Sequence, residues 1–120
     1  MSSRLASFRY AFSGWWHALR TQPNSRIHAV ISTVVFLAGW WLGLSRLEWA
    51  IIVLTVALVW MGEFFNTALE ALADLASPEH HALAKVGIDV AAAAVLLGAL
   101  AAVLVGLLIL GPHLLERLGW

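Results

Sequence analysis

The sequence predicts an all-α membrane protein, with one amphipathic helix in the membrane interface followed by three transmembrane helices. Of its 120 residues, 62% are hydrophobic and only 12% are charged, whereas about a quarter of the residues in soluble domains are charged. The mean hydropathy is +0.86. The apolar residues also form long blocks instead of an alternating pattern, and the length allows one domain. A soluble helical bundle is the alternative, and three blocks of this length count against it.

The first element, residues 1–22, is predicted to be an amphipathic helix lying in the membrane interface. Its aromatic and aliphatic residues recur at helical spacing, with arginines, a serine and a histidine between them, and this pattern is typical of helices that lie at headgroup depth. Pro23 is predicted to end the helix. The apolar positions are Phe8, Phe12, Trp15, Trp16 and Leu19.

Three later segments are long and apolar enough to cross a bilayer, which takes about 20 residues. They are residues 27–44, 48–72 and 90–110. The short connection SRLE, residues 45–48, makes the first two spans a hairpin, and residues 76–89 form a longer polar link. We expect Gly111-Pro112 to end the third span.

The distribution of basic residues predicts the orientation of the spans, because cytoplasmic loops carry an excess of Lys and Arg. Five basic residues precede the first span or lie in the second link, against two on the other side. The N-terminus and residues 76–89 are therefore predicted to be cytoplasmic. A formal net charge of zero gives no reason to expect a nucleic-acid partner. The five are Arg4, Arg9, Arg20, Arg26 and Lys85, and the two are Arg46 and Arg117.

Four polar residues interrupt the second span, in the stretch GEFFNTALEALADL. At about 100° per residue, Glu63, Asn66, Glu70 and Asp74 fall on one stripe about 80° wide, which we call the acidic stripe. Inserting a charged residue such as Asp at the centre of a span costs about 2.5–3.5 kcal/mol of free energy. Such residues persist where they face a cavity, a partner or a metal.

Two interpretations of the acidic stripe remain open from the residues alone. The residues can act as polar contacts between subunits. Alternatively, together with Asp89 at the start of the third span, they bind a divalent cation, since carboxylates suit Mg²⁺ carrying a phosphate. A deeper acid could then act as a general base. This second interpretation predicts phosphoryl transfer at the membrane surface, in a homo-oligomer whose subunits cover one another's stripes.

The histidines give weaker signals. Glu79, His80 and His81 could bind a metal, although a solvated loop is the simpler interpretation. We expect His28 and His113 to be interfacial residues at opposite ends of the spans.

Nearly the whole chain resembles a known family. The segment EFFNTALEALADLASPEHHALAK…DVAAAAVL resembles the E-x-x-N-[ST]-A-[IL]-E-x-x-x-D signature of the small prokaryotic integral-membrane diacylglycerol kinases and undecaprenol kinases. FRYAFSGW and NSRIH at the front extend the match, and SPEHHALAK with NSRIH is closer to the undecaprenol kinase branch. The resemblance implies a homotrimer in the bacterial plasma membrane, with active sites at subunit interfaces near the cytoplasmic surface.

The resemblance also implies roles for individual residues. Glu63 would be the general base on a lipid hydroxyl, and Glu70 would bind the Mg²⁺ of the co-substrate ATP. Asn66 and Asp89 would complete the site. The residues placed along the nucleotide would be Tyr10, Asp74, Glu79, His80, His81 and Lys85.

The chain departs from the family pattern at two positions. Ile88 stands where the family usually has a lysine before Asp89, and Gln22 stands where it has a second metal-binding glutamate. Lysine neutralises phosphate charge during transfer, and Lys85 is a candidate substitute three residues earlier. The main interpretation is an ATP-dependent lipid kinase. The alternatives are a kinase-like protein that has lost transfer and, from another class, a cation-conducting oligomer. Conduction would need the acidic stripe to continue through the apolar residues 50–61.

Overall fold

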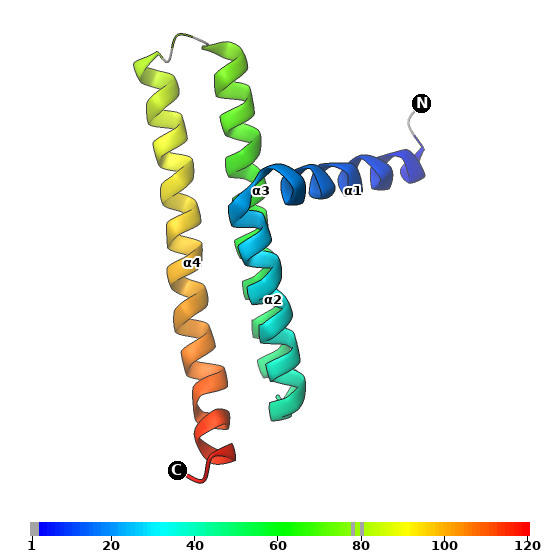
Figure 1. Ribbon diagram of the computed structural model, residues 1–120, viewed down its shortest axis with the longest axis vertical. Helices are drawn as coiled ribbons and strands as arrows, with labels where there is room; N and C mark the ends of the chain where they lie inside the picture. The colour runs from blue at the N-terminus through cyan, green and yellow to red at the C-terminus, as the bar shows by residue number, and fades with distance from the viewer. Residues whose placement is uncertain (1–2, 78, 80) are drawn as a thin grey trace.

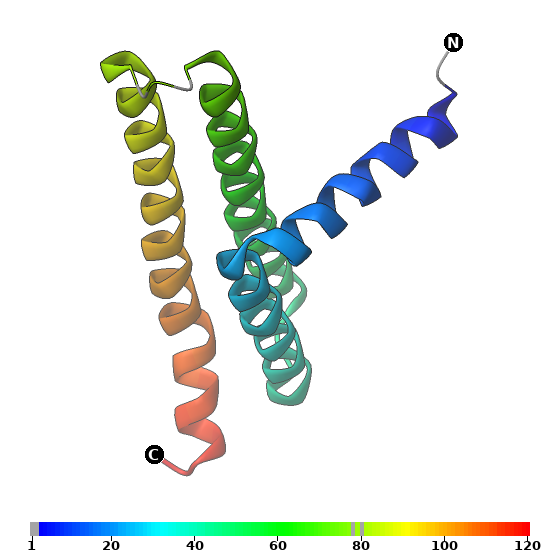
Figure 2. The ribbon, with the colours of Figure 1, turned by 45° about the horizontal axis from the view of Figure 1, so that its top comes forward.

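A computed structural model describes residues 3–77, 79 and 81–120, and these residues form four α-helices. Helices α2, α3 and α4 run side by side, whereas α1 leaves them sideways and points away from α4 (Figures 1 and 2). Beyond the level of α1, α3 and α4 continue together for several turns before their connection (Figure 1). The helices are α1 (Arg4–Thr21), α2 (Pro23–Leu42), α3 (Arg46–Ala76) and α4 (Ala82–Arg117).

Local sequence explains where each helix begins. The Ser3 hydroxyl accepts a hydrogen bond from the backbone of the first turn of α1, and Pro23 occupies the first turn of α2, where its missing N–H costs nothing. Ser45 and Glu48 form a reciprocal capping box at the start of α3. His81 caps α4 through its Nδ1 atom. The predicted connection at residues 45–48 therefore belongs largely to the first turn of α3.

A left-handed glycine and a close approach shape the turn between α2 and α3. Gly43 has a φ of 73°, a conformation that glycine adopts without strain, and its N–H donates to the Gly39 carbonyl at the end of α2. Gly39 is buried, and a Cβ atom there would lie 2.9 Å from side-chain atoms of Leu44 and Trp49. The GWWLG sequence thus permits the tight packing of this hairpin.

We expect Gly39→Ala to destabilise the protein by about 1–3 kcal/mol, because an added methyl group overpacks a filled site. Gly106→Ala is the matched control, since no heavy atom lies within 4 Å of a Cβ built there. Thermal unfolding in detergent micelles would measure both. An unfolding midpoint for Gly39→Ala equal to that of the wild type would contradict the close packing.

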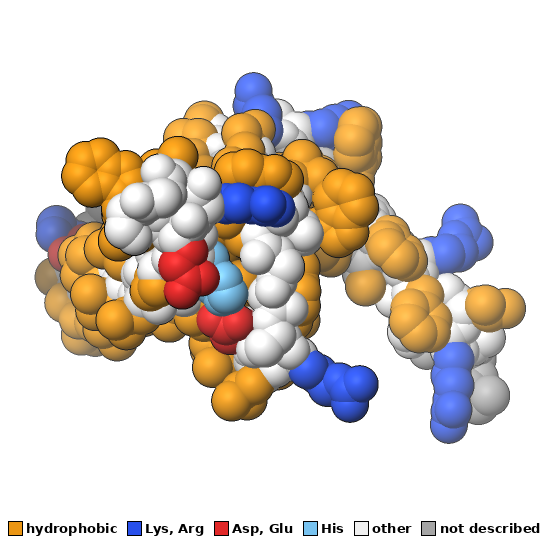
Figure 3. All heavy atoms as spheres, turned by 90° about the horizontal axis from the view of Figure 1, so that it is seen from below, with side chains coloured by type: hydrophobic (Ala, Val, Ile, Leu, Met, Phe, Trp, Pro, Cys, Tyr) orange, Lys and Arg blue, Asp and Glu red, His pale blue; other side chains and the backbone are white. Residues whose placement is uncertain are grey.

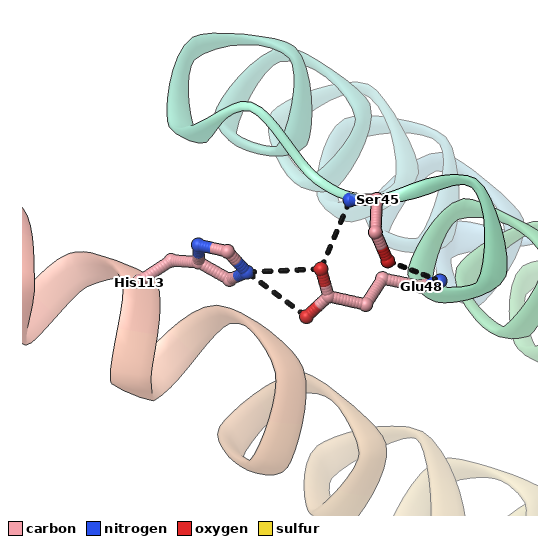
Figure 4. Close-up of polar contacts among 3 residues, drawn as sticks. All are labelled: Ser45, Glu48 and His113. Atoms are coloured by element: carbon pink, nitrogen blue, oxygen red, sulfur yellow. Dashed lines mark hydrogen bonds and ion pairs between the residues drawn. The ribbon is translucent and has the colours of Figure 1, made fainter.

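The prediction that Gly111-Pro112 ends the third span helix is wrong, because α4 continues through both residues to Arg117. Proline removes one backbone hydrogen bond, and contacts with the α2–α3 turn hold the turns beyond it. His113 Nε2 lies 2.9 Å from Glu48 Oε2, in the cluster with Ser45 that Figure 4 shows. Arg117 donates to the Trp41 carbonyl at 2.6 Å and lies over the Trp41 ring.

The surface of the three long helices is apolar. By length and composition, α2, α3 and α4 can each cross a membrane, as far as the described residues show. Most of their large hydrophobic side chains are exposed, for example Leu97 and Leu108 on α4, whereas soluble monomers rarely expose large apolar patches. Seen from the end that carries the C-terminus, charged side chains gather on the end face and hydrophobic ones cover the flanks (Figure 3). This confirms the helical fold and the three apolar spans.

The helices are longer than the predicted spans. Helix α3 reaches Ala76, beyond residues 48–72, and α4 begins at Ala82, well before residues 90–110. The connection between α3 and α4 consists of residues 77–81 and is therefore shorter than the predicted link, residues 76–89. Lys85 and Asp89 are consequently helical and share one face of α4.

Candidate functional site

The deepest member of the acidic stripe is buried and paired. Glu63 is 3% exposed, and its Oε1 atom lies 2.8 Å from Nε2 of His28 on α2. A carboxylate away from water needs such a partner, because its hydration is lost. The prediction of His28 as an interfacial residue is therefore incomplete, since the structure makes it the partner of Glu63.

Aromatic side chains surround the Glu63–His28 pair. Trp60, one turn before Glu63, is buried, and its Nε1 atom donates to the Ser32 hydroxyl at 3.0 Å. Trp15 from α1 packs on both Trp60 and Phe64, with ring centroids 5.4 Å apart in each case. Helix α1 thus packs against the part of α3 that carries Glu63.

Asn66 and Glu70 lie on α3 towards the connection with α4. The Asn66 side-chain amide donates to Glu70 Oε1 at 3.1 Å. The amide oxygen Oδ1 of Asn66 is buried and has no hydrogen-bond partner among the described residues. A buried acceptor without a donor costs free energy, and an amide oxygen beside a carboxylate suits a hard cation such as Mg²⁺. The chemistry of this donor set therefore fits the predicted metal.

A pocket lies between α3 and α4 near their connection. It has a volume of about 280 Å³, and Asp74, Lys85 and Ile88 contribute to its lining. Lys85 Nζ lies 2.6 Å from Asp89 Oδ2, and both side chains are exposed. A cationic nitrogen therefore lies one helical turn from the position where the family pattern has lysine, beside the predicted site residue Asp89.

The other predicted nucleotide residues are spread over three places. Tyr10 is exposed on α1, Gln22 lies at the junction of α1 and α2, and Glu79 is exposed in the α3–α4 turn. His81 caps α4, and His80 lies outside the described residues. Within the described part of the chain, no three His, Asp or Glu side chains group together as a metal site. No hydrogen bond there joins Tyr10 or Gln22 to the acidic stripe, so their roles stay predictions.

An apolar groove runs along the membrane-spanning part of the molecule. It has a volume of about 490 Å³ and is lined by residues 28–35 of α2, 52–59 of α3 and 99–114 of α4. His28, Ser32 and Thr55 are the polar residues of its lining, and the Thr55 hydroxyl donates to its own helix. The groove therefore offers one ionisable group, the imidazole at its His28 end.

Hairpin geometry is the sequence signal that could have identified both histidine pairs. In an antiparallel hairpin, residues equally far from the turn face each other. His28 lies 17 residues before Ser45 and Glu63 lies 18 residues after it. His113 is also predicted to be an interfacial residue. It lies 34 residues after Glu79, which is in the α3–α4 turn, and its partner Glu48 lies 31 residues before Glu79.

Comparison with known proteins identifies the family of the chain. Residues 9–110 match the family described as prokaryotic diacylglycerol kinase. A diacylglycerol kinase of Synechocystis sp. is 46% identical over 113 residues, covering 93% of this chain and 65% of the relative, so the chain spans less than two thirds of that protein. An undecaprenol kinase of Bacillus subtilis is 40% identical, covering 90% of this chain and 88% of the relative.

A third relative is more distant. The diacylglycerol kinase of Escherichia coli (strain K12) is 27% identical over 104 residues, covering 87% of this chain and 85% of the relative. The family match extends from α1 to the last turns of α4 before Gly111-Pro112, so it contains the acidic stripe and both helices that meet at Glu63. The chain therefore belongs to the prokaryotic diacylglycerol kinase family of membrane lipid kinases.

Proposed function

We propose that this protein transfers the γ-phosphoryl group of Mg-ATP to the hydroxyl of a membrane lipid, either undecaprenol or diacylglycerol. The observation that carries the proposal is the order of groups along α3. Glu63 is a buried, paired carboxylate in the middle of α3, and the side-chain oxygens of Asn66 and Glu70 follow along the helix towards the α3–α4 connection. This order suits a reaction between a lipid hydroxyl and a water-soluble nucleotide.

Each group has a role in that reaction. Glu63 would act as the general base on the lipid hydroxyl. Glu70 and Asn66, with Gln22 as a weaker neutral ligand, would hold Mg²⁺, which when bound neutralises charge on the nucleotide phosphates. The residues proposed to lie along the nucleotide are Tyr10, Asp74, Glu79, His80, His81, Lys85 and Asp89.

The membrane arrangement is part of the proposal. The basic residues favour a cytoplasmic N-terminus and a cytoplasmic α3–α4 connection. Helix α1 leaves the other helices at a wide angle (Figure 2), as expected of a helix lying in the interface of a bacterial plasma membrane. The dispersed nucleotide residues favour a homo-oligomer in which neighbouring subunits would complete each site, and the family resemblance implies a homotrimer.

The test is transfer of labelled γ-phosphate from ATP to undecaprenol and to diacylglycerol in mixed micelles. We expect transfer that stops in EDTA and resumes with added Mg²⁺. Glu70→Gln should raise the Mg²⁺ concentration needed for half-maximal rate by about tenfold or more, because a carboxylate is lost from the hard-oxygen ligands that Mg²⁺ prefers. Glu116→Gln, near the opposite end of the molecule, is the matched control.

Either of two results would count against the proposal. Transfer that continues unchanged in EDTA would show that the reaction does not need a bound metal ion. Folded, oligomeric protein with no transfer to either lipid would favour the kinase-like protein that has lost activity. The cation-conducting alternative gains no support, since the groove lining is almost entirely apolar and the hydroxyl of Thr55, one of its polar residues, donates to its own helix.

A further inference from the structure

The two histidine–glutamate pairs of this protein engage their carboxylates differently. In the pair near the C-terminus, both oxygens of Glu48 lie within hydrogen-bond distance of His113, and Oε1 also accepts from the backbone N–H of Ser45 (Figure 4). In the pair near the middle of α3, Oε1 of Glu63 lies 2.8 Å from His28 Nε2. Among the described residues, Oε2 of Glu63 has no hydrogen-bond partner. The fold thus uses both oxygens of one carboxylate and a single oxygen of the other.

The contact with His28 gives the two oxygens of Glu63 different environments. A carboxylate that is to act as a base is ionised beforehand, and an ionised carboxylate only accepts hydrogen bonds. Nε2 of His28 therefore carries a hydrogen and donates it to Oε1. The terminal torsion of a glutamate side chain is broad, so without this bond neither oxygen would have a fixed direction. With Oε1 held, Oε2 is the oxygen that remains for a substrate.

The imidazole is itself held in place by contacts between helices. Ser32 lies one turn after His28 on α2, and its hydroxyl accepts a hydrogen bond from Trp60 Nε1 at 3.0 Å. The Trp60 ring lies edge-on to the imidazole, with ring centroids 6.3 Å apart. Trp60 is 8% exposed, and Trp15 of α1 also packs on it. Packing and hydrogen bonds of this kind are what a group needs in order to orient another.

We propose that His28 is a positioning residue for Glu63, whose Oε1 it holds so that Oε2 takes the proton of the lipid hydroxyl. This inference rests on the proposed kinase function, in which Glu63 is the base. As the lipid oxygen bonds to the γ-phosphorus, the bond from phosphorus to the ADP oxygen breaks and the hydroxyl proton moves to Oε2. His28 keeps its own hydrogen throughout. Its bond joins α2 and α3 of one subunit, so it can orient Glu63 whichever subunits form the surface that the lipid reaches.

Two amide substitutions of His28 test this role. The amide nitrogen of glutamine lies as many bonds from the backbone as histidine Nε2, whereas that of asparagine corresponds to Nδ1. His28→Gln can therefore still donate to Glu63, and His28→Asn is too short to do so. We expect kcat to fall by about 10²-fold in His28→Asn, as for a misplaced catalytic group, and to stay within about threefold of the wild type in His28→Gln. The KM for ATP should be unchanged in both. His113→Asn, the same substitution in the other pair, should keep the kcat of the wild type in folded protein.

A measurement on the wild type tests the donor without any substitution. The nitrogen-15 chemical shifts of the assigned imidazole nitrogens show which of them carries hydrogen. We expect hydrogen on Nε2 of His28, in protein without lipid or nucleotide. Hydrogen on Nδ1 alone would overturn the inference, even if His28→Asn does not fold.

The outcomes are distinguishable from those of the proposed function. If the wild type transfers phosphate and His28→Asn matches its kcat, Glu63 needs no orientation from His28 and the inference is overturned. An equally large loss in folded His28→Gln and His28→Asn also overturns it, because the imidazole would then do more than donate a hydrogen bond. If the wild type transfers no phosphate, the proposed function fails, and this inference fails with it.

Discussion

Glu63→Gln should reduce phosphate transfer by about 10²–10⁴-fold, the range typical of losing general acid–base catalysis. Glu63 is 3% exposed and is hydrogen-bonded to His28. A neutral amide of nearly the same shape fills the same space but cannot act as the proposed base on the lipid hydroxyl. The loss should therefore appear in kcat, in protein whose oligomeric state and unfolding midpoint stay close to those of the wild type.

Glu48→Gln is the matched control for this variant. Glu48 is also on α3 and is also paired with a histidine, His113, but it lies at the opposite end of the molecule. Glutamine serves at this capping-box position as well. Glu48→Gln should keep most of its transfer rate, and an equal loss in both variants would mean that acid-to-amide changes on α3 act through folding and not through the site.

Lys85→Ala should lower transfer by about tenfold or more, because a phosphate-directed cation stabilises the charge of the transferring group. Lys85 lies 2.6 Å from Asp89, and both Lys85 and Ile88 line the pocket between α3 and α4. We expect Ile88→Lys in the Lys85→Ala background to restore much of the lost rate, since it returns a cation to the same pocket one helical turn further along α4.

Lys85→Arg separates charge from other contributions of the side chain, because it keeps the positive charge at the same place. It should retain far more activity than Lys85→Ala. The two decisive measurements are the initial rate of phosphate transfer at saturating Mg-ATP and the KM for ATP. Lys85→Ala at the wild-type rate, together with no gain from Ile88→Lys, would show that the chain works without a cation at either position.

The parts of the fold that could be predicted from sequence depend on local information. Apolar length predicts the three spans, and the position of the acidic stripe follows from helical periodicity. Contacts between helices override the local signals elsewhere. Gly111-Pro112 is a strong signal for a helix end, but α4 continues because His113 and Arg117 contact the α2–α3 turn.

In the candidate site, too, local sequence predicts some features, whereas others depend on contacts between helices. Glu63 is recognisable as a costly acid in a span, whereas its partner His28 belongs to another helix and depends on how α2 packs against α3. Gln22 and Tyr10 are distant from the acidic stripe in sequence, and no hydrogen bond in the described part of a single chain connects them to it. Their proposed roles would depend on ligands and, in the proposed homotrimer, on neighbouring subunits, which a sequence specifies only indirectly.

Helices α3 and α4 are longer than a bilayer is thick, and this bears on how the reaction rate should depend on lipid concentration. At about 1.5 Å per residue, the 31 residues of α3 and 36 residues of α4 measure about 46 Å and about 54 Å, whereas the hydrocarbon layer is about 30 Å thick. If the proposed function is right, the protein would work across two phases, with its lipid in the bilayer and its nucleotide in water. Its rate should follow the mole fraction of lipid in the bilayer and stay constant when vesicles are diluted in bulk.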